Sequence, residues 1–180
     1  MKTLEDALLL AIEAHRGQQD KYGAPYIFHP LRVMCRLETE TERMVALLHD
    51  VVEDTALTVQ DLAEADYPGE VVAAVDHLSR RPGETYADFT LRIRPHPLAR
   101  RVKLADLQDN MDVRRMSELD EEALTRLRRY RNAWSMLTTT ADPRVGRLIA
   151  VNRSDARTEP KSNVGSGELI AGYGLVGDAH

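Results

Sequence analysis

The chain has 180 residues, of which 43% are hydrophobic and 29% are charged, so it can bury a core of ordinary size. Its 29 acidic residues outnumber its 24 basic ones, and the net charge of −5 argues against a protein that coats nucleic acid or an anionic membrane. The one cysteine, Cys35, excludes an internal disulfide and fits a reducing compartment such as the cytoplasm. No apolar run reaches the roughly 20 residues of a membrane-spanning helix, and the N-terminus does not resemble a signal peptide. We therefore expect a soluble cytoplasmic protein.

Helical spacing of apolar residues recurs along most of the chain, and no segment alternates like a half-buried strand, which predicts an all-α fold. A small polar residue followed three positions later by an acid is typical of helix starts, and this spacing occurs at Thr3, Thr58, Thr85 and Ser117. Another helix is expected to begin near Thr39 and to continue as far as Val51.

The character of the sequence changes after about residue 140. Five of the ten glycines lie in the last thirty residues, and helical periodicity disappears there. We expect one domain over residues 1–140. Residues 141–180 are expected to form a short helix, around residues 144–151, followed by a flexible glycine-rich tail.

Two polar residues, His49 and Asp50, interrupt the apolar part of the helix expected from Thr39. Burying such groups is costly unless a partner satisfies them, and a metal ion is one strong partner. Glu53 and Asp54 follow at or just past the expected end of this helix, where carboxylates gain nothing from the helix dipole. This placement indicates a functional role for the acidic pair.

A second group of polar residues shares one face of a later helix. Lys103, Asp106 and Asn110 are spaced at i, i+3 and i+7, so they present a cation, a carboxylate and an amide from one row. Such a row can bind a metal ion with its anionic ligand, which makes Lys103 a candidate substrate contact. His29 could complete a ligand set with His49 and Asp106. An ion-paired surface row is the alternative.

Several other polar residues have ordinary structural explanations. We expect His15 to be a hydrogen-bonded core histidine, and the remaining histidines, His77, His96 and His180, to be structural or solvated. The basic cluster next to Tyr130 is expected to be a solvated helix face rather than an RNA-binding patch; it consists of Arg126, Arg128, Arg129 and Arg131.

Four segments together form a specific pattern: residues 15–18 (HRGQ), 23–30 (GAPYIFHP), 47–55 (LLHDVVEDT) and 103–106 (KLAD). In this order they resemble the hydrolase domain of the Rel/SpoT alarmone enzymes and their small single-domain relatives. That family belongs to the HD superfamily of metal-dependent phosphohydrolases. The resemblance runs from about His15 to Asn110 and implies a multi-helix bundle with a metal site in its centre.

The resemblance also implies roles for individual residues. The positions that match the family's ligands for a divalent ion, commonly Mn²⁺, are His29, His49, Asp50 and Asp106. This mixed set of imidazoles and carboxylates also suits Fe²⁺ or Zn²⁺. Glu53 and Asp54 match the acidic pair that positions and activates water, while Lys21 and Asn110 match contacts to the nucleotide.

Three positions depart from the family pattern. Asp20 stands where the family has an arginine that stacks on the guanine base, and an acid there would repel phosphate. Val113 replaces a threonine, and Leu107 replaces an arginine that follows the last metal ligand. Tyr86 offers a substitute stacking surface for the base, or else packs between helices.

These observations lead to a principal hypothesis and two alternatives. The principal one is a metal-dependent pyrophosphohydrolase that removes pyrophosphate from the 3′ position of a guanosine tetra- or pentaphosphate. Asp20 and Val113 motivate the first alternative, hydrolysis of another nucleotide or small phosphate ester. The second is a nucleotide-binding module without turnover, against which Glu53 and Asp54 argue. In every case the expected partner is a small nucleotide, not a nucleic acid polymer or a membrane.

Overall fold

The computed structural model describes residues 1–116 and 118–139, together with the short stretches 152–153, 162–163, 169–170 and 174–175. The chain divides into two compact units, Met1–Thr140 and Ala141–His180. Each unit is described by itself.

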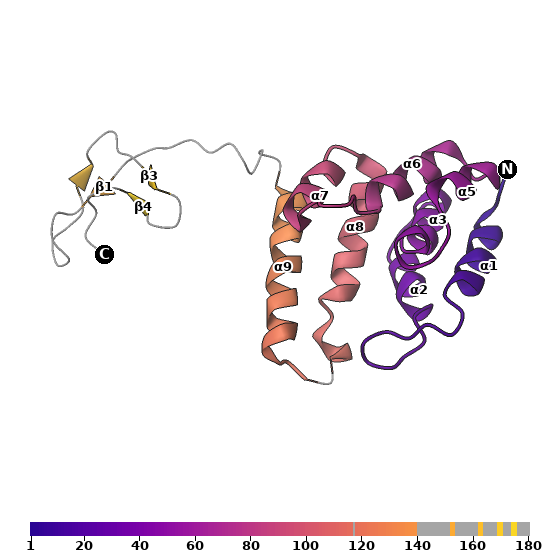
Figure 1. Ribbon diagram of the computed structural model, residues 1–180, viewed down its shortest axis with the longest axis horizontal. Helices are drawn as coiled ribbons and strands as arrows, with labels where there is room; N and C mark the ends of the chain where they lie inside the picture. Colours follow the sequence, from indigo (N-terminus) through magenta and orange to yellow (C-terminus); the bar gives the residue numbers. More distant parts are fainter. Residues whose placement is uncertain (117, 140–151, 154–161, 164–168, 171–173, 176–180) are drawn as a thin grey trace. The chain divides into compact units, whose positions relative to one another are not determined.

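The described part of the first unit is helical, which confirms the expected all-α fold (Figure 1). Its helices are α1 (Leu4–Ala14), α2 (Phe28–Met34), α3 (Glu40–Leu48), α4 (Val51–Asp54), α5 (Val59–Glu64), α6 (Gly69–Leu78), α7 (Tyr86–Ile93), α8 (Pro97–Asn110), the 3₁₀ turn η1 (Val113–Arg115) and α9 (Glu121–Thr138). Helix α3 packs against α1, α2, α6 and α8. Because it has neighbours on so many sides, its residues 44–48 are all buried and form the centre of the core.

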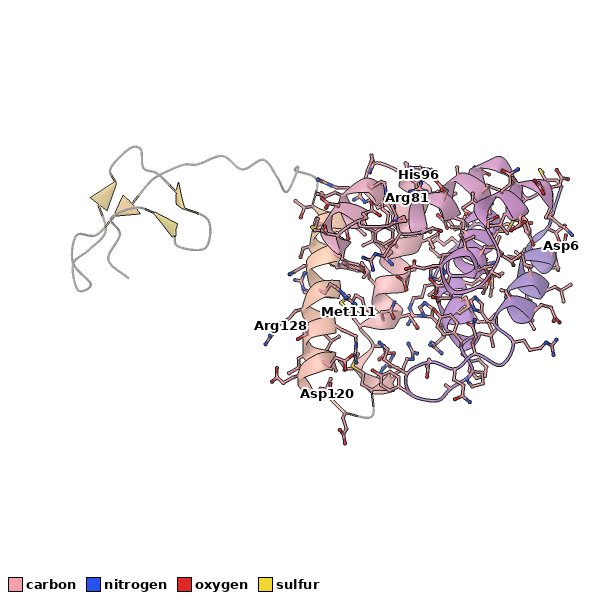
Figure 2. The ribbon with its side chains drawn as sticks, in the orientation of Figure 1. Asp6, Arg81, His96, Met111, Asp120 and Arg128 are labelled. Carbon is pink, nitrogen blue, oxygen red and sulfur yellow. The ribbon has the colours of Figure 1, made fainter. Side chains whose placement is uncertain are left out.

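The capping patterns mark the helix starts correctly at three of the four positions. Thr3 and Thr58 form capping boxes, and the Thr85 side chain accepts a hydrogen bond from the backbone of the third residue of α7. The fourth position differs. Ser117 lies outside the described residues, and α9 begins at Glu121 after Asp120, whose side chain accepts from the Ala123 N–H (Figure 2).

His49 and Asp50 do not lie inside a helix, contrary to the sequence-based expectation. Helix α3 ends at Leu48 and α4 begins at Val51, so the two residues occupy the junction. Both residues keep right-handed helical backbone angles at this junction. His49 Nε2 lies 3.2 Å from Asp50 Oδ2, so the two side chains meet there.

The described residues of the second unit form two antiparallel strand pairs, which the sequence analysis did not anticipate. Strand β1 (Asn152–Arg153) pairs with β2 (Ser162–Asn163), and β3 (Leu169–Ile170) pairs with β4 (Gly174–Leu175). Two-residue strands are too short to leave an alternating pattern in the sequence. The helix expected at residues 144–151, and most of the tail expected to be flexible, lie outside the described residues. Within the described parts of the chain, no helix has the length and apolar character needed to cross a bilayer.

A partly buried ion pair fixes the connection between α6 and α7. Arg92 donates to the Glu84 carboxylate from Nε at 2.7 Å and from Nη2 at 2.9 Å. The same guanidinium donates to the backbone carbonyls of His77 and Ser79. The hydrogen bonds from Arg92 are the largest influence on the pKa of Glu84, which falls to about 2.

Glu84→Gln is expected to lower the free energy of unfolding by about 1–3 kcal/mol at pH 7, because it removes a charge-assisted pair. The pKa of Glu84 is lower in the folded state, so the pair stabilises fully above the unfolded pKa of about 4.5 and less as pH falls toward 2. Urea titrations of parent and variant should therefore converge as pH falls from about 4.5 toward 2. Exposed Glu64→Gln is the control, and an equal loss in both variants would contradict the assignment.

Candidate functional site

Donor atoms from three parts of the chain converge in the first unit. His29 comes from α2, His49 and Asp50 from the α3–α4 junction, and Asp106 from α8. His29 Nε2 lies 3.4 Å from Asp50 Oδ2 and 3.2 Å from Asp106 Oδ1. His49 Nε2 lies 3.2 Å and 3.8 Å from the same two atoms. All the expected metal ligands therefore face one point.

The outer nitrogens of both imidazoles are bound to acceptors. His29 Nδ1 lies 2.9 Å from Asp109 Oδ2, and His49 Nδ1 lies 2.7 Å from the Ala46 carbonyl oxygen. Each Nδ1 must carry a proton to donate, so a neutral ring presents the lone pair of Nε2. The His49 Nε2 atom is buried, and no hydrogen-bond partner for it lies among the described residues.

Positive charge stabilises the carboxylates of this cluster. Burial opposes ionisation of Asp106, but Lys103 and the two histidines hold its pKa well below the usual range. The pKa of Asp50 is likewise lowered: burial again opposes ionisation, and His49 and His29 outweigh it. Burial opposes protonation of both histidines, but the neighbouring carboxylates raise the pKa of His29 and of His49, so protons on these rings balance the carboxylate charges when no metal is bound. A divalent ion suits this mixed nitrogen and oxygen donor set, and His29, His49 and Asp50 alone already form a group whose ligand atoms all lie within 4.8 Å of one another.

The row on α8 surrounds Asp106. Lys103 Nζ lies 2.7 Å from Asp106 Oδ2, and the Asn110 amide donates to Asp106 Oδ1. The Lys103 side chain is only 13% exposed, and its ammonium lies 5.2 Å from the centre of the Phe89 ring. Lys103 and Asn110, the two predicted substrate contacts on α8, therefore also hold the predicted metal ligand Asp106 in place.

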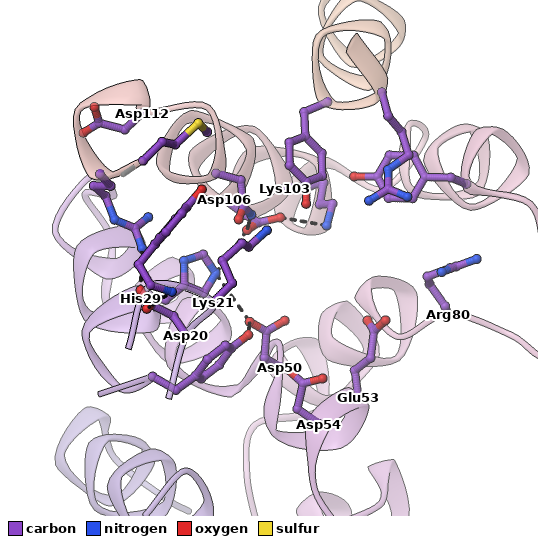
Figure 3. A pocket seen from close by; sticks show the side chains of 18 of the residues that line it. Asp20, Lys21, His29, Asp50, Glu53, Asp54, Arg80, Lys103, Asp106 and Asp112 are labelled. Carbon is purple, nitrogen blue, oxygen red and sulfur yellow. Dashed lines mark hydrogen bonds and ion pairs between the residues drawn. The ribbon is translucent and has the colours of Figure 1, made fainter. Parts of the chain in front are cut away.

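A pocket of about 350 Å³ opens over this cluster (Figure 3). Nine of the ten predicted site residues line it: Lys21, His29, Asp50, Glu53, Asp54, Tyr86, Lys103, Asp106 and Asn110. The remaining one, His49, is 3% exposed and reaches the cluster from the protein interior. The structure thus brings the predicted residues together in one place.

The acidic pair lies at the edge of the pocket on the single-turn helix α4. Partial burial and the negative charge of Asp50 raise the pKa of both Glu53 and Asp54. The Gln18 amide donates to the backbone carbonyl of Asp54 at 3.1 Å, and the Tyr26 hydroxyl donates to Asp50 Oδ2 at 2.7 Å. A carboxylate with a raised pKa beside a metal-ligand cluster is suited to accept a proton from water.

The pocket also contains cations that the sequence analysis missed. Arg129 lines it, with its guanidinium 5.0 Å from the centre of the Tyr86 ring, and Arg80 lines it near Glu53. Arg128 and Arg129 are both exposed, as expected for a solvated helix face, but Arg129 also lines the pocket, whereas Arg128 points away from the domain (Figure 2).

Asp20 has a structural role that the sequence did not reveal. Its Oδ1 accepts from the backbone N–H groups of Tyr22 at 2.9 Å and Ala24 at 3.0 Å. Its Oδ2 accepts from Arg115 Nη2 at 3.1 Å, so its charge is compensated at the pocket edge. Of the other two departures, Leu107 is buried in the core and Val113 is half-exposed on η1.

Curated relatives of the chain carry hydrolase and synthase names. The bifunctional (p)ppGpp synthase/hydrolase SpoT of Escherichia coli (strain K12) is 48% identical over 69 residues, which are 36% of this chain and 10% of SpoT. A guanosine-3′,5′-bis(diphosphate) 3′-pyrophosphohydrolase of Vibrio cholerae is 36% identical over 84 residues, which are 44% of this chain and 12% of the relative. A GTP pyrophosphokinase of Streptomyces coelicolor is 31% identical over 135 residues, which are 68% of this chain and 16% of the relative. The chain therefore spans only a small part of these relatives.

A solved structure has the same fold. It is described as a metazoan ortholog of SpoT that hydrolyses ppGpp, with a TM-score of 0.61 and 22% identity. The match covers 78% of this chain and 87% of the other. No protein-family model matches the chain. The relatives and this structure confirm the expected resemblance to the Rel/SpoT proteins.

The donor cluster predicts a stability response to metal. A ligand at 100 times its Kd adds about 2.7 kcal/mol to the free energy of unfolding, so Mn²⁺ should raise the Tm of the parent protein. His49→Ala should abolish this rise, because it removes a buried donor. Differential scanning fluorimetry with and without Mn²⁺ measures the effect. His77→Ala, which lies outside the cluster, should respond like the parent, and a normal response of His49→Ala would rule out His49 as a ligand.

Proposed function

The chain is homologous to the SpoT/Rel proteins, and we propose that it is a metal-dependent pyrophosphohydrolase that removes pyrophosphate from the 3′ position of guanosine-3′,5′-bis(diphosphate). The observation that carries this proposal is the buried donor cluster, which opens into a pocket with Glu53 and Asp54 at its edge. The names of the relatives support the choice of substrate.

The proposed metal ligands are His29, His49, Asp50 and Asp106, and the proposed ion is Mn²⁺, with Fe²⁺ or Zn²⁺ as alternatives. When bound, such an ion polarises a phosphoryl oxygen and lowers the pKa of a bound water. Lys103, Asn110 and Tyr26 orient the two carboxylate ligands through the hydrogen bonds and ion pair described above.

In the proposed reaction, Glu53 and Asp54 act on the attacking water. Glu53, whose pKa is raised, accepts a proton while the water oxygen bonds to the phosphorus attached to the 3′ oxygen. The bond between phosphorus and the 3′ oxygen breaks, and that oxygen leaves with a proton. The products are the guanosine 5′-diphosphate and pyrophosphate.

The proposed substrate contacts are Lys21, Lys103, Asn110 and Tyr86, to which the pocket geometry adds Arg80 and Arg129. The four cations in this set, Lys21, Lys103, Arg80 and Arg129, favour a polyphosphate substrate although the chain has a net charge of −5. The Tyr86 ring, with Arg129 above it, offers a flat surface for a base. A small nucleotide is therefore the proposed partner, and the cytoplasm, where a single cysteine stays reduced, is the proposed location.

A different nucleotide or a small phosphate ester is the second candidate substrate. Asp20 favours it, because a paired carboxylate stands at the pocket edge where the family has a base-stacking arginine. The two candidates are separated by measuring kcat/KM for guanosine-3′,5′-bis(diphosphate) and for a panel of other nucleotides. A higher kcat/KM for another nucleotide would mean that this nucleotide, and not guanosine-3′,5′-bis(diphosphate), is the substrate.

Glu53→Gln is expected to lower kcat by at least about 100-fold, because it removes the proton acceptor. The Kd for the nucleotide should stay within a few fold, since the amide has nearly the same shape. Pyrophosphate release in the presence of Mn²⁺ and isothermal titration calorimetry measure the two quantities. Glu64→Gln is a control outside the pocket. If the parent binds the nucleotide but releases no pyrophosphate, the chain is a binding module and the hydrolase proposal fails.

A further inference from the structure

A second buried carboxylate lies directly behind the donor cluster. Asp109 follows Asp106 by three residues on α8, and its side chain is fully buried. It does not line the pocket, so it is not a candidate substrate contact. It does contact a predicted metal ligand, because its Oδ2 lies 2.9 Å from His29 Nδ1.

Arginines from two separate segments surround this carboxylate. Arg32 on α2 donates to both oxygens, from Nε at 2.8 Å and Nη2 at 3.0 Å. Arg36 donates to Oδ1 at 3.1 Å and Arg115 to Oδ2 at 2.7 Å. An isolated buried carboxylate would be costly, and these guanidinium groups offset that cost.

The hydrogen bonds around Asp109 decide which nitrogen of His29 carries the proton. Both oxygens of Asp109 accept from the guanidinium groups of Arg32, Arg36 and Arg115, which can only donate, so Asp109 is paired as a carboxylate. An ionised carboxylate only accepts hydrogen bonds, so His29 Nδ1 must donate. The other ring nitrogen, Nε2, is then the one that faces Asp50 and Asp106.

We propose that Asp109 is a positioning residue that fixes the ring orientation and tautomer of His29 so that its Nε2 is presented to a metal ion. This inference rests on the metal site of the proposed function. Arg32, Arg36 and Arg115 keep Asp109 charged and hold it in place. The three arginines would suffice to pair with Asp109 in a purely structural ion cluster. The additional hydrogen bond to His29 is what connects Asp109 to the metal site.

The test compares Asp109→Asn with a matched control, Glu42→Gln. Glu42 is also a buried carboxylate, paired with Arg101 and bonded to backbone N–H groups, but it does not line the pocket. The affinity for Mn²⁺ is measured from the electron paramagnetic resonance signal of the free ion, which needs no turnover. We expect Asp109→Asn to weaken Mn²⁺ binding by about 10–100-fold, as losses of metal-supporting partners do. Glu42→Gln should bind Mn²⁺ within about twofold of the parent, since it leaves His29 untouched.

Two results would overturn the proposal: Asp109→Asn binding Mn²⁺ as tightly as the parent, or Glu42→Gln losing as much affinity. A parent that binds no Mn²⁺ would overturn it together with the metal site. A parent that binds Mn²⁺ and loses affinity in Asp109→Asn, but hydrolyses no guanosine-3′,5′-bis(diphosphate), would support the positioning role and reject the proposed substrate.

A second measurement needs no variant and applies even if Asp109→Asn does not fold. In the zinc-loaded parent protein labelled with ¹⁵N-histidine, the ring nitrogens of His29 are assigned by NMR. We expect Nδ1 of His29 to carry a proton that resonates at low field, with Nε2 unprotonated. An unprotonated Nδ1 of His29 would contradict the proposal whatever the variants show.

Discussion

Two ionised carboxylates and two histidines face one point in the interior of the helical domain, and positive charge must balance the repulsion between the carboxylates. The donors come from α2, the α3–α4 junction and α8, so these segments must keep their relative positions for the cluster to exist. Helix α3 contacts both α2 and α8, and its buried residues 44–48 hold the three segments together. The packing of the core therefore determines the relative positions of the four donor side chains.

Each donor is also held from outside the cluster. Asp106 is held by Lys103 and Asn110, and Asp50 is held by the Tyr26 hydroxyl. The imidazoles of His29 and His49 are held through their Nδ1 atoms. Such supports restrict the ligand side chains to few orientations, which reduces the conformational entropy lost when an ion binds. The same hydrogen bonds explain why so many polar groups can be buried together.

Local signals in the sequence predicted much of this arrangement. The caps at Thr3, Thr58 and Thr85 needed only neighbours within one turn, and the i, i+3, i+7 row on α8 needed only helical spacing. The helix break at His49 escaped prediction because residues 44–52 keep helical apolar spacing and contain no glycine or proline to mark it. Asp109 escaped because its partner His29 lies 80 residues away, a separation that no local pattern reports.

The pair between Asp20 and Arg115 joins positions 95 residues apart, and it bears on how this pocket can change over evolutionary time. An arginine at position 20 would place two guanidinium groups against each other and leave Arg115 with only Asp109 as a partner. An arginine at position 20 is therefore disfavoured for as long as position 115 is also an arginine, so the two positions constrain each other's substitution.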